Sequence, residues 1–135
     1  MIYVYNRKLE TYSGDNNYKI FRPYTLGNPF SWEKDRETKA MYLANSREEA
    51  VKMYSHYFDL MYSTNLDFRE LVDEMYEKYK NGEDIYLECY CKKYLCKDTT
   101  LHKDELSCHG DIIKSKLESR LLKEKINNLK NKTDI

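Results

Sequence analysis

The sequence predicts an α/β fold, in which a small single-domain sheet has helices packed on it. Residues Ile85–Cys91 alternate apolar with polar side chains, a period typical of a strand with one buried face, and we expect this strand to lie in the interior of the sheet. Two segments before it carry apolar residues at helical spacing. A length of 135 residues suffices for one ordinary core.

Two short strands are predicted near the amino terminus. Met1–Tyr5 alternates Ile and Val with Tyr, and a turn cluster follows at Thr11–Asn17. Tyr18–Phe21 is the second strand, which Pro23 ends because proline cannot donate to a ladder. The elements therefore follow in the order strands, two helices, strand, helix.

Two helices are predicted between these strands and Ile85–Cys91. Ser46 and Glu49 form a capping-box pattern that opens a helix reaching about Tyr62. A second helix is expected over Asp67–Tyr79, and Gly82 follows its end. We interpret the aromatic stripe on these helices as core or as a homo-oligomer face: Tyr54, Tyr57, Phe58, Tyr76 and Tyr79.

A last helix is predicted from Gly110 onward. Ile113, Leu117, Leu121 and Ile126 are expected on one face of it, and lysines cover most of the remaining surface. We expect residues 1–126 to form the single domain and residues 127–135 to be a frayed tail.

Composition excludes several classes of function. The chain has 23 Lys and Arg against 23 Asp and Glu, so a nucleic-acid partner is not expected. No apolar run approaches membrane-spanning length, so we expect no membrane partner and a cytoplasmic location. In a reducing compartment, the four cysteines are expected to be thiols or metal ligands rather than disulfides.

A ligand site is predicted where two unusual segments meet. Arg22 ends a strand and has a planar fork suited to phosphate or carboxylate. Gly110 and Asp111 open a helix whose free N–H groups favour an anion, and His109 beside them can bind a phosphate or transfer a proton. The alternative is a helix cap in which His109 is packed and its hydrogen bonds are made within the protein. The predicted ligand-binding residues are Asn6, Arg22, Leu26, Gly27, Asn28, Arg47, His109, Gly110 and Asp111.

The cysteines leave three interpretations open. The residues that could hold a structural zinc are Cys89, Cys91, Cys96, Cys108 and His109, but their spacing matches no standard zinc motif. Buried thiols are the interpretation that we favour, because free cysteine is among the most buried residue types. A catalytic thiol is the third, with Cys108 preferred because a helix N-terminus lowers the pKa of a thiol.

Two segments of the sequence, in their order along the chain, resemble those of a known family. Arg22-Pro23 is followed by Leu26-Gly27-Asn28-Pro29-Phe30, and Cys89-Tyr90-Cys91 is followed at a distance by Cys108-His109-Gly110-Asp111. In this order they resemble domain of unknown function 4326, a family of bacteria and their phages. The resemblance implies a small α/β domain and no established activity. The chain departs from it in Lys97–Ser107, which intervenes after an additional cysteine.

These observations support a leading hypothesis and two alternatives. We expect a small-ligand-binding domain for a nucleotide or nucleotide-like phosphate compound, and in a phage such a domain could sequester a nucleotide signal of the bacterial host without turnover. The first alternative is an enzyme on the same ligand class, with His109 and Asp111 as acid and base. The second is an interaction module or inhibitor of a host protein, acting through the tyrosine-rich helices.

Overall fold

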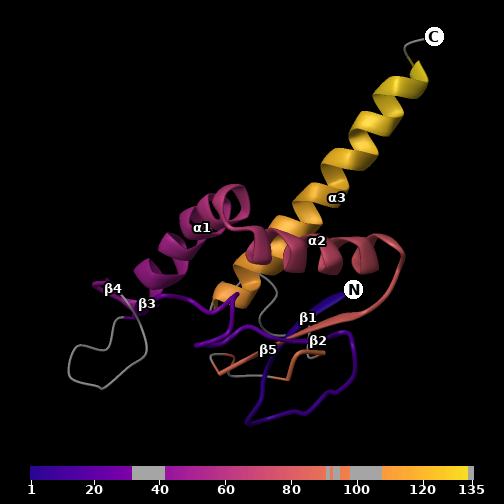
Figure 1. Cartoon of the computed structure of the whole chain (residues 1–135). Coiled ribbons are helices and arrows are strands. Elements are labelled where there is room, and N and C mark those ends of the chain that lie inside the picture. Colours follow the sequence, from indigo (N-terminus) through magenta and orange to yellow (C-terminus); the bar gives the residue numbers. More distant parts are fainter. Residues whose placement is uncertain (32–41, 91, 93–94, 98–107, 134–135) are drawn as a thin grey trace.

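A computed structural model describes residues 1–31, 42–90, 92, 95–97 and 108–133 (Figure 1). Its elements follow the predicted order. The strands are β1 (Ile2–Asn6), β2 (Asn17–Lys19), β3 (Phe30–Ser31), β4 (Tyr42–Leu43) and β5 (Ile85–Cys89), and the helices are α1 (Arg47–Thr64), α2 (Leu66–Lys80) and α3 (His109–Thr133). The predicted α/β class is confirmed.

The main sheet has three strands in the order β1-β5-β2, and both outer strands run parallel to β5. Ile2 of β1 lies opposite Ile85, and Tyr18 of β2 lies opposite Leu87. The predicted interior strand is therefore confirmed, although it ends at Cys89, because the chain bends at Tyr90. The short strands β3 and β4 pair separately, also in parallel.

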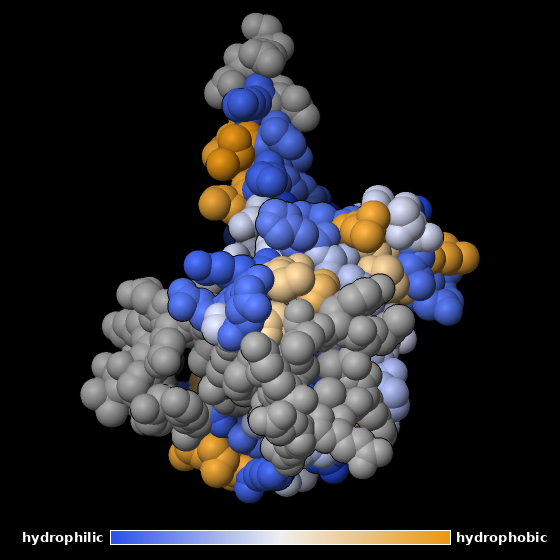
Figure 2. All heavy atoms as spheres, turned by 90° about the vertical axis from the view of Figure 1, so that its left-hand side faces the viewer, coloured by the Kyte–Doolittle hydropathy of each residue, from blue (hydrophilic) through white to orange (hydrophobic). Residues whose placement is uncertain are grey.

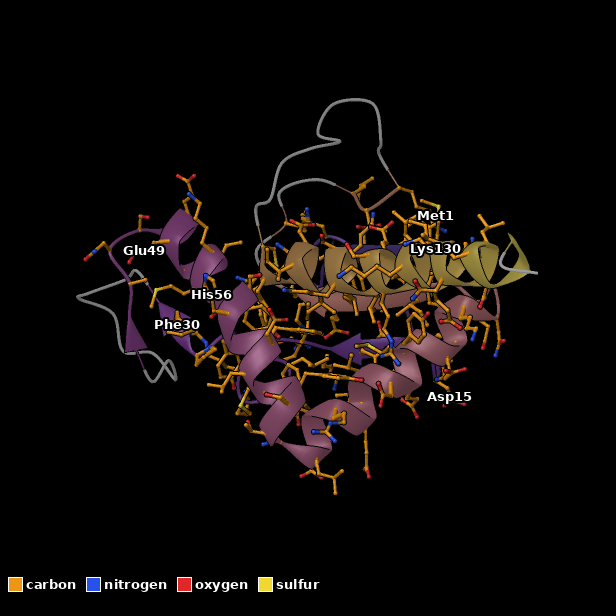
Figure 3. All side chains as sticks on the ribbon, turned by 90° about the horizontal axis from the view of Figure 1, so that it is seen from above. Met1, Asp15, Phe30, Glu49, His56 and Lys130 are labelled. Atoms are coloured by element: carbon orange, nitrogen blue, oxygen red, sulfur yellow. The ribbon has the colours of Figure 1, made fainter. Side chains whose placement is uncertain are left out.

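All three helices lie on one face of this sheet (Figure 1). Seen from above, α1, α2 and α3 cover the strands, with Phe30 and Glu49 toward one end and Met1 and Asp15 toward the other (Figure 3). The core between the layers joins alternate residues of the strands to the apolar faces of the helices: Ile2, Val4, Ile85 and Leu87 with Tyr54, Phe58, Phe68, Val72, Met75, Tyr76, Ile113 and Leu117. Three rings of the predicted aromatic stripe are thus buried in the core of the single chain.

The opposite face of the sheet is covered by rings from the chain itself. Tyr86 of β5 stacks on Tyr3 at 5.2 Å and on Tyr12 at 4.2 Å between ring centroids. Tyr12 belongs to the segment that connects β1 with β2. The alternation of Ile85–Cys91 therefore separates two packed faces, rather than a buried face from a solvated one.

Local capping fixes where the helices begin and end. The Ser46 hydroxyl accepts the N–H of Glu49 at 3.1 Å, and the Glu49 carboxylate accepts the N–H of Asn45 at 3.1 Å. Asn65 alone joins α1 to α2, since its N–H donates to Met61 O and its side chain caps α2 by accepting from Phe68 N–H. The capping pattern was therefore a correct guide to α1.

Helix α3 is longer than we expected. We expected a frayed tail after Ile126, whereas the helix continues to Thr133. No proline or glycine follows Gly110 in this segment, and Leu, Lys, Glu and Arg are favourable helix residues. Only the last turns of α3, beyond the contacts of Glu124 with α2, rise clear of the other elements (Figure 1), and Ile126, expected on the same apolar face as Ile113, is 44% exposed.

Candidate functional site

The carboxyl ends of the three parallel strands meet at one edge of the sheet. Arg7 follows β1, Ile20 follows β2 and Tyr90 follows β5. Backbone bonds hold these exits together, because Arg7 N–H donates to Cys89 O at 2.9 Å and Ile20 N–H donates to Glu88 O at 3.0 Å. Ligands of open α/β sheets bind at this kind of edge.

Aromatic and cationic side chains alternate in space at this edge. The Phe21 ring lies 4.9 Å from Tyr90 and 5.1 Å from Tyr24 between centroids, and both tyrosines are 46% exposed. The Arg7 guanidinium lies 5.0 Å from the Phe21 centroid and 5.3 Å from that of Tyr90. We name the following residues the edge cluster: Arg7, Lys8, Lys19, Phe21, Tyr24 and Tyr90.

A buried carboxylate on β5 supports Arg7 from below. Glu88 is 7% exposed, and its Oε2 lies 3.6 Å from Arg7 Nε. Its Oε1 accepts from the Tyr5 hydroxyl at 2.8 Å and from the Asn17 amide at 3.1 Å. Burial, and then the bond to Glu88, raise the pKa of the Tyr5 hydroxyl, so Tyr5 remains a donor. This network orients the Arg7 fork toward the exposed rings.

Arg22 lies in the same loop as Phe21 and Tyr24. Its Nη1 is buried and has no hydrogen-bond partner within the described residues. The loop closes tightly, because a Cβ on Gly27 would lie 2.9 Å from the backbone nitrogen of Arg22. A buried guanidinium N–H without a partner is costly, and an anion that accepts from it removes that cost.

The amino terminus of α3 is packed against the end of β2. His109 is 5% exposed, its Nε2 contacts Ile20 O, and its ring meets Tyr54 edge-on with centroids 5.0 Å apart. Since a carbonyl oxygen only accepts, Nε2 carries the hydrogen, and Nδ1 faces Cys108 Sγ at 3.7 Å. Both ring nitrogens of His109 are therefore engaged within the protein.

Gly110 allows this close packing. A Cβ at this position would lie 2.6 Å from Val4 Cγ1 and 2.9 Å from Ile20 Cδ1. Its N–H donates to Cys108 Sγ at 3.3 Å. Asp111 accepts from Lys92 Nζ at 2.7 Å and from Cys108 N–H at 3.2 Å. The N–H groups of Gly110 and Asp111 are thus bonded within the protein, to Cys108 Sγ and to Cys108 O.

Asn28 and Leu26, two more of the predicted site residues, are bonded or buried within the fold. Asn28 donates to Ala50 O at 3.2 Å and accepts from Phe30 N–H at 2.9 Å. Leu26 is fully buried and its carbonyl accepts from the Tyr54 hydroxyl at 2.7 Å.

Asn6 links β1 to the segment after β5. Its amide donates to Tyr90 O at 3.1 Å and to Lys92 O at 2.9 Å, and its side-chain oxygen accepts from Lys8 N–H. Asn6, Arg22 and His109 therefore lie at the same sheet edge, each close to a strand exit. The side chain of Arg47 lies outside the described residues.

The cysteines divide into two groups. Cys89 and Cys108 are buried in the core, whereas Cys96 lies near the other face, with its Sγ 3.4 Å from Glu10 Oε1. Cys91 lies outside the described residues, as does most of Lys97–Ser107. Within the described part of the chain, no three His, Cys, Asp or Glu residues are grouped to hold a metal ion.

Comparison with known proteins identifies the family. Residues 4–119 match the sequence model of a domain of unknown function, DUF4326. The chain belongs to this family. Searches of the curated proteins and of the solved structures found no match. None of the helices described here is long and apolar enough to cross a membrane.

Sequence reasoning missed most of the edge cluster of this DUF4326 domain. Because the chain has 14 tyrosines, a single tyrosine is a weak signal of a site in this sequence. Arg7 and Tyr90 directly follow β1 and β5, whereas the strands predicted from the sequence ended at Tyr5 and Cys91, so neither residue was recognised as a strand exit. Arg7 therefore comes together with Phe21 and Tyr90 through strand order, which the sequence does not reveal.

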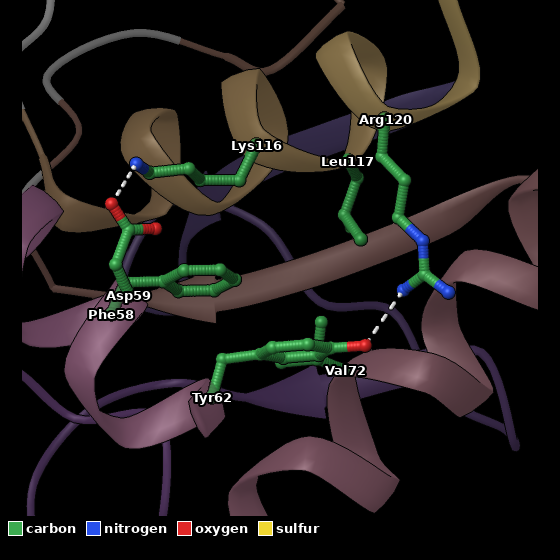
Figure 4. Close-up of a pocket in the computed structure, with 7 residues that line it drawn as sticks. All are labelled: Phe58, Asp59, Tyr62, Val72, Lys116, Leu117 and Arg120. Carbon is green, nitrogen blue, oxygen red and sulfur yellow. Dashed lines mark hydrogen bonds and ion pairs between the residues drawn. The ribbon is translucent and has the colours of Figure 1, made fainter. Parts of the chain in front are cut away.

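A groove of about 310 Å³ lies between the helices of the domain (Figure 4). Its lining consists of Phe58, Asp59, Tyr62, Val72, Lys116, Leu117 and Arg120. Each cation at its rim faces a carboxylate, since Lys116 Nζ lies 3.0 Å from Asp59 and Arg120 lies 2.8 Å from Asp73. The groove therefore offers apolar surface without the net positive charge of the edge cluster.

Asp73 is the most constrained carboxylate near this groove. It accepts from the Tyr62 hydroxyl at 2.6 Å and from Arg120 at 2.8 Å. Burial opposes its ionisation, but these two hydrogen bonds together with the charges of Arg120 and Arg69 outweigh burial and lower the pKa of the Asp73 carboxyl. Asp73 thus joins α1, α2 and α3 through charge-assisted bonds.

Proposed function

We propose that this DUF4326 domain binds a small nucleotide-like anion at the carboxyl edge of its sheet. The observation that carries the proposal is the edge cluster, in which exposed rings and cations lie within stacking distance at the exits of three parallel strands. A base has a face to stack on Tyr24 or Tyr90, and a phosphate has Arg7, Lys8 and Lys19 around it.

Two further observations support an anion. The cluster contains three cations and no carboxylate of its own, and Glu88 beneath it contacts Arg7 alone among them. Arg22 Nη1, in the same loop, has no partner among the described residues. Each charge-assisted bond to such an anion contributes about 1.5–3 kcal/mol, which is about ten- to a hundredfold in affinity.

Binding without turnover is the favoured activity. A general acid or base must reach the substrate, but His109 is 5% exposed and both of its ring nitrogens contact the protein. Asp111 is held by Lys92 and by the backbone of Cys108. We place this activity in the cytoplasm of a bacterial cell, where a phage-encoded domain would counter host defence by withholding a nucleotide signal.

Titration calorimetry with a panel of mono-, di- and cyclic nucleotides tests the proposal. At least one compound should bind, and Arg7→Ala and Tyr90→Ala should each lower the affinity for that compound about tenfold or more. Lys52→Ala is the matched control, because Lys52 lies on α1 and pairs with Glu48 at the surface. Chromatography of the mixture should recover the nucleotide unchanged. Absence of binding across the panel, or equal affinity of all three variants, contradicts the proposal.

A further inference from the structure

The second half of α3 carries an apolar stripe outside the folded body. The family match ends at residue 119, whereas α3 continues to Thr133, and its last turns rise clear of the other elements (Figure 1). Leu122 is 60% exposed, Ile126 44% and Leu129 63%. Figure 2 shows apolar spheres among hydrophilic ones on this projecting helix.

The stripe points away from the body of the domain. Glu124 fixes the orientation of the helix, because it contacts Tyr76 and Lys80 of α2. Each residue turns an α-helix by about 100°, so Leu122 and Ile126 lie about 160° on either side of Glu124. The side of the helix that carries the stripe is therefore directed to solvent.

The spacing of the stripe is that of a two-stranded coiled coil. Leu122, Ile126 and Leu129 follow one another at intervals of four and three, which places isoleucine at position a and leucine at both d positions. Isoleucine at a with leucine at d favours a pair of helices. The positions that flank such a seam, e and g, are lysine at each described place after residue 119: Lys123, Lys125 and Lys130.

These lysines decide the kind of partner. Residues 120–135 contain five Lys or Arg and two Asp or Glu, a net charge of +3, although the whole chain is neutral. Two copies of this segment would place lysine against lysine along the seam, which opposes self-pairing. A narrow seam between rows of lysine fits a single helix with acidic flanks.

We propose that residues 119–133 of α3 form the basic strand of a heterodimeric coiled coil with an acidic amphipathic helix of another protein. That helix carries apolar residues at a and d and Glu or Asp at e and g. Pairing covers the stripe and neutralises the lysines. The surface is independent of the edge cluster, since it lies beyond the part of the chain that matches the family.

Fluorescence anisotropy with the full chain and two labelled synthetic peptides tests the proposal. Both peptides have three heptads with isoleucine at a and leucine at d, and they differ only in having glutamate or lysine at e and g. The glutamate peptide should bind, with an affinity that falls as salt rises, and the lysine peptide should bind at least about tenfold more weakly.

Three variants locate the contact. Ile126→Lys should lower the affinity for the glutamate peptide at least about tenfold, because it places a charge in the seam. Reversing Lys123, Lys125 and Lys130 to glutamate should invert the preference between the two peptides. Asn127→Lys, which lies away from the stripe, should leave the affinity unchanged, and circular dichroism confirms that each variant folds.

Four outcomes overturn the proposal. They are equal affinity for both peptides, unchanged affinity in Ile126→Lys, self-association of the chain that Ile126→Lys abolishes, and tighter binding to phosphatidylserine vesicles or duplex DNA than to the glutamate peptide. The third outcome assigns the stripe to a second copy of the chain, and the fourth to an anionic surface.

Discussion

Replacing His109 by alanine should destabilise the fold strongly, because the structure gives this side chain a packing role. The change leaves the Ile20 carbonyl without its donor, which costs about 1–3 kcal/mol. It also removes the edge-on contact with Tyr54, worth about 0.5–1.5 kcal/mol. The expected loss is therefore about 1.5–4.5 kcal/mol, a large part of the roughly 5–15 kcal/mol that stabilises an ordinary domain.

Urea denaturation followed by circular dichroism measures this loss. The midpoint should fall while the slope with denaturant stays constant, because the surface exposed on unfolding does not change. His56→Ala is the control: this histidine is exposed on α1 and its replacement should change stability by less than about 0.5 kcal/mol. A loss for His109→Ala no larger than that of the control would refute the packing role and return His109 to the candidates for ligand contact.

Three more predictions concern stability. Gly110→Ala should destabilise the fold by about 1–3 kcal/mol, since the new Cβ meets Val4 Cγ1 at 2.6 Å. In a double-mutant cycle, Val4→Ala should make the Gly110→Ala change less costly, and strictly additive losses would contradict the clash. Tyr54→Phe should cost about 1–2 kcal/mol in urea denaturation, because its hydroxyl is a buried donor to Leu26 O; no change would contradict this bond. The lowered pKa of Asp73 stabilises the folded protein at pH values above the unfolded pKa of about 3.9, and this stabilisation is lost as the pH falls through the folded pKa. The difference in free energy of unfolding between wild type and Asp73→Asn should therefore shrink in acid. A constant difference from about pH 7 to about pH 2 would contradict this prediction.

Local signals in the sequence were sufficient for the individual elements. The capping pattern at Ser46 and Glu49 marked the start of α1, and the period of two marked β5. Both signals are local, because a cap and a pleat depend on residues within one turn or one strand. The family resemblance was also confirmed, over residues 4–119.

Features that depend on strand order could not be derived in the same way. The alternation in Ile85–Cys91 places Glu88 on the polar face of the strand. It is nevertheless 7% exposed, because Tyr5 and Asn17 from the two outer strands contact its carboxylate. Arg7 reaches Phe21 only because β1 and β2 flank β5 in parallel. Sequence periodicity reports which face of a strand is apolar, and it carries no information on what lies beside or above that strand.

The central position of β5 also determines when the protein can fold. β1 and β2 each pair with β5 and not with each other, so the first 84 residues contain no partner for either strand. A ribosome adds about 5–20 residues per second, and over that interval both strands lack their partner while α1 and α2 lack the complete sheet on which their apolar faces pack. The sheet closes in one step when β5 leaves the exit tunnel. A nascent chain stalled before Ile85 would therefore be a substrate for chaperones rather than a partly folded domain.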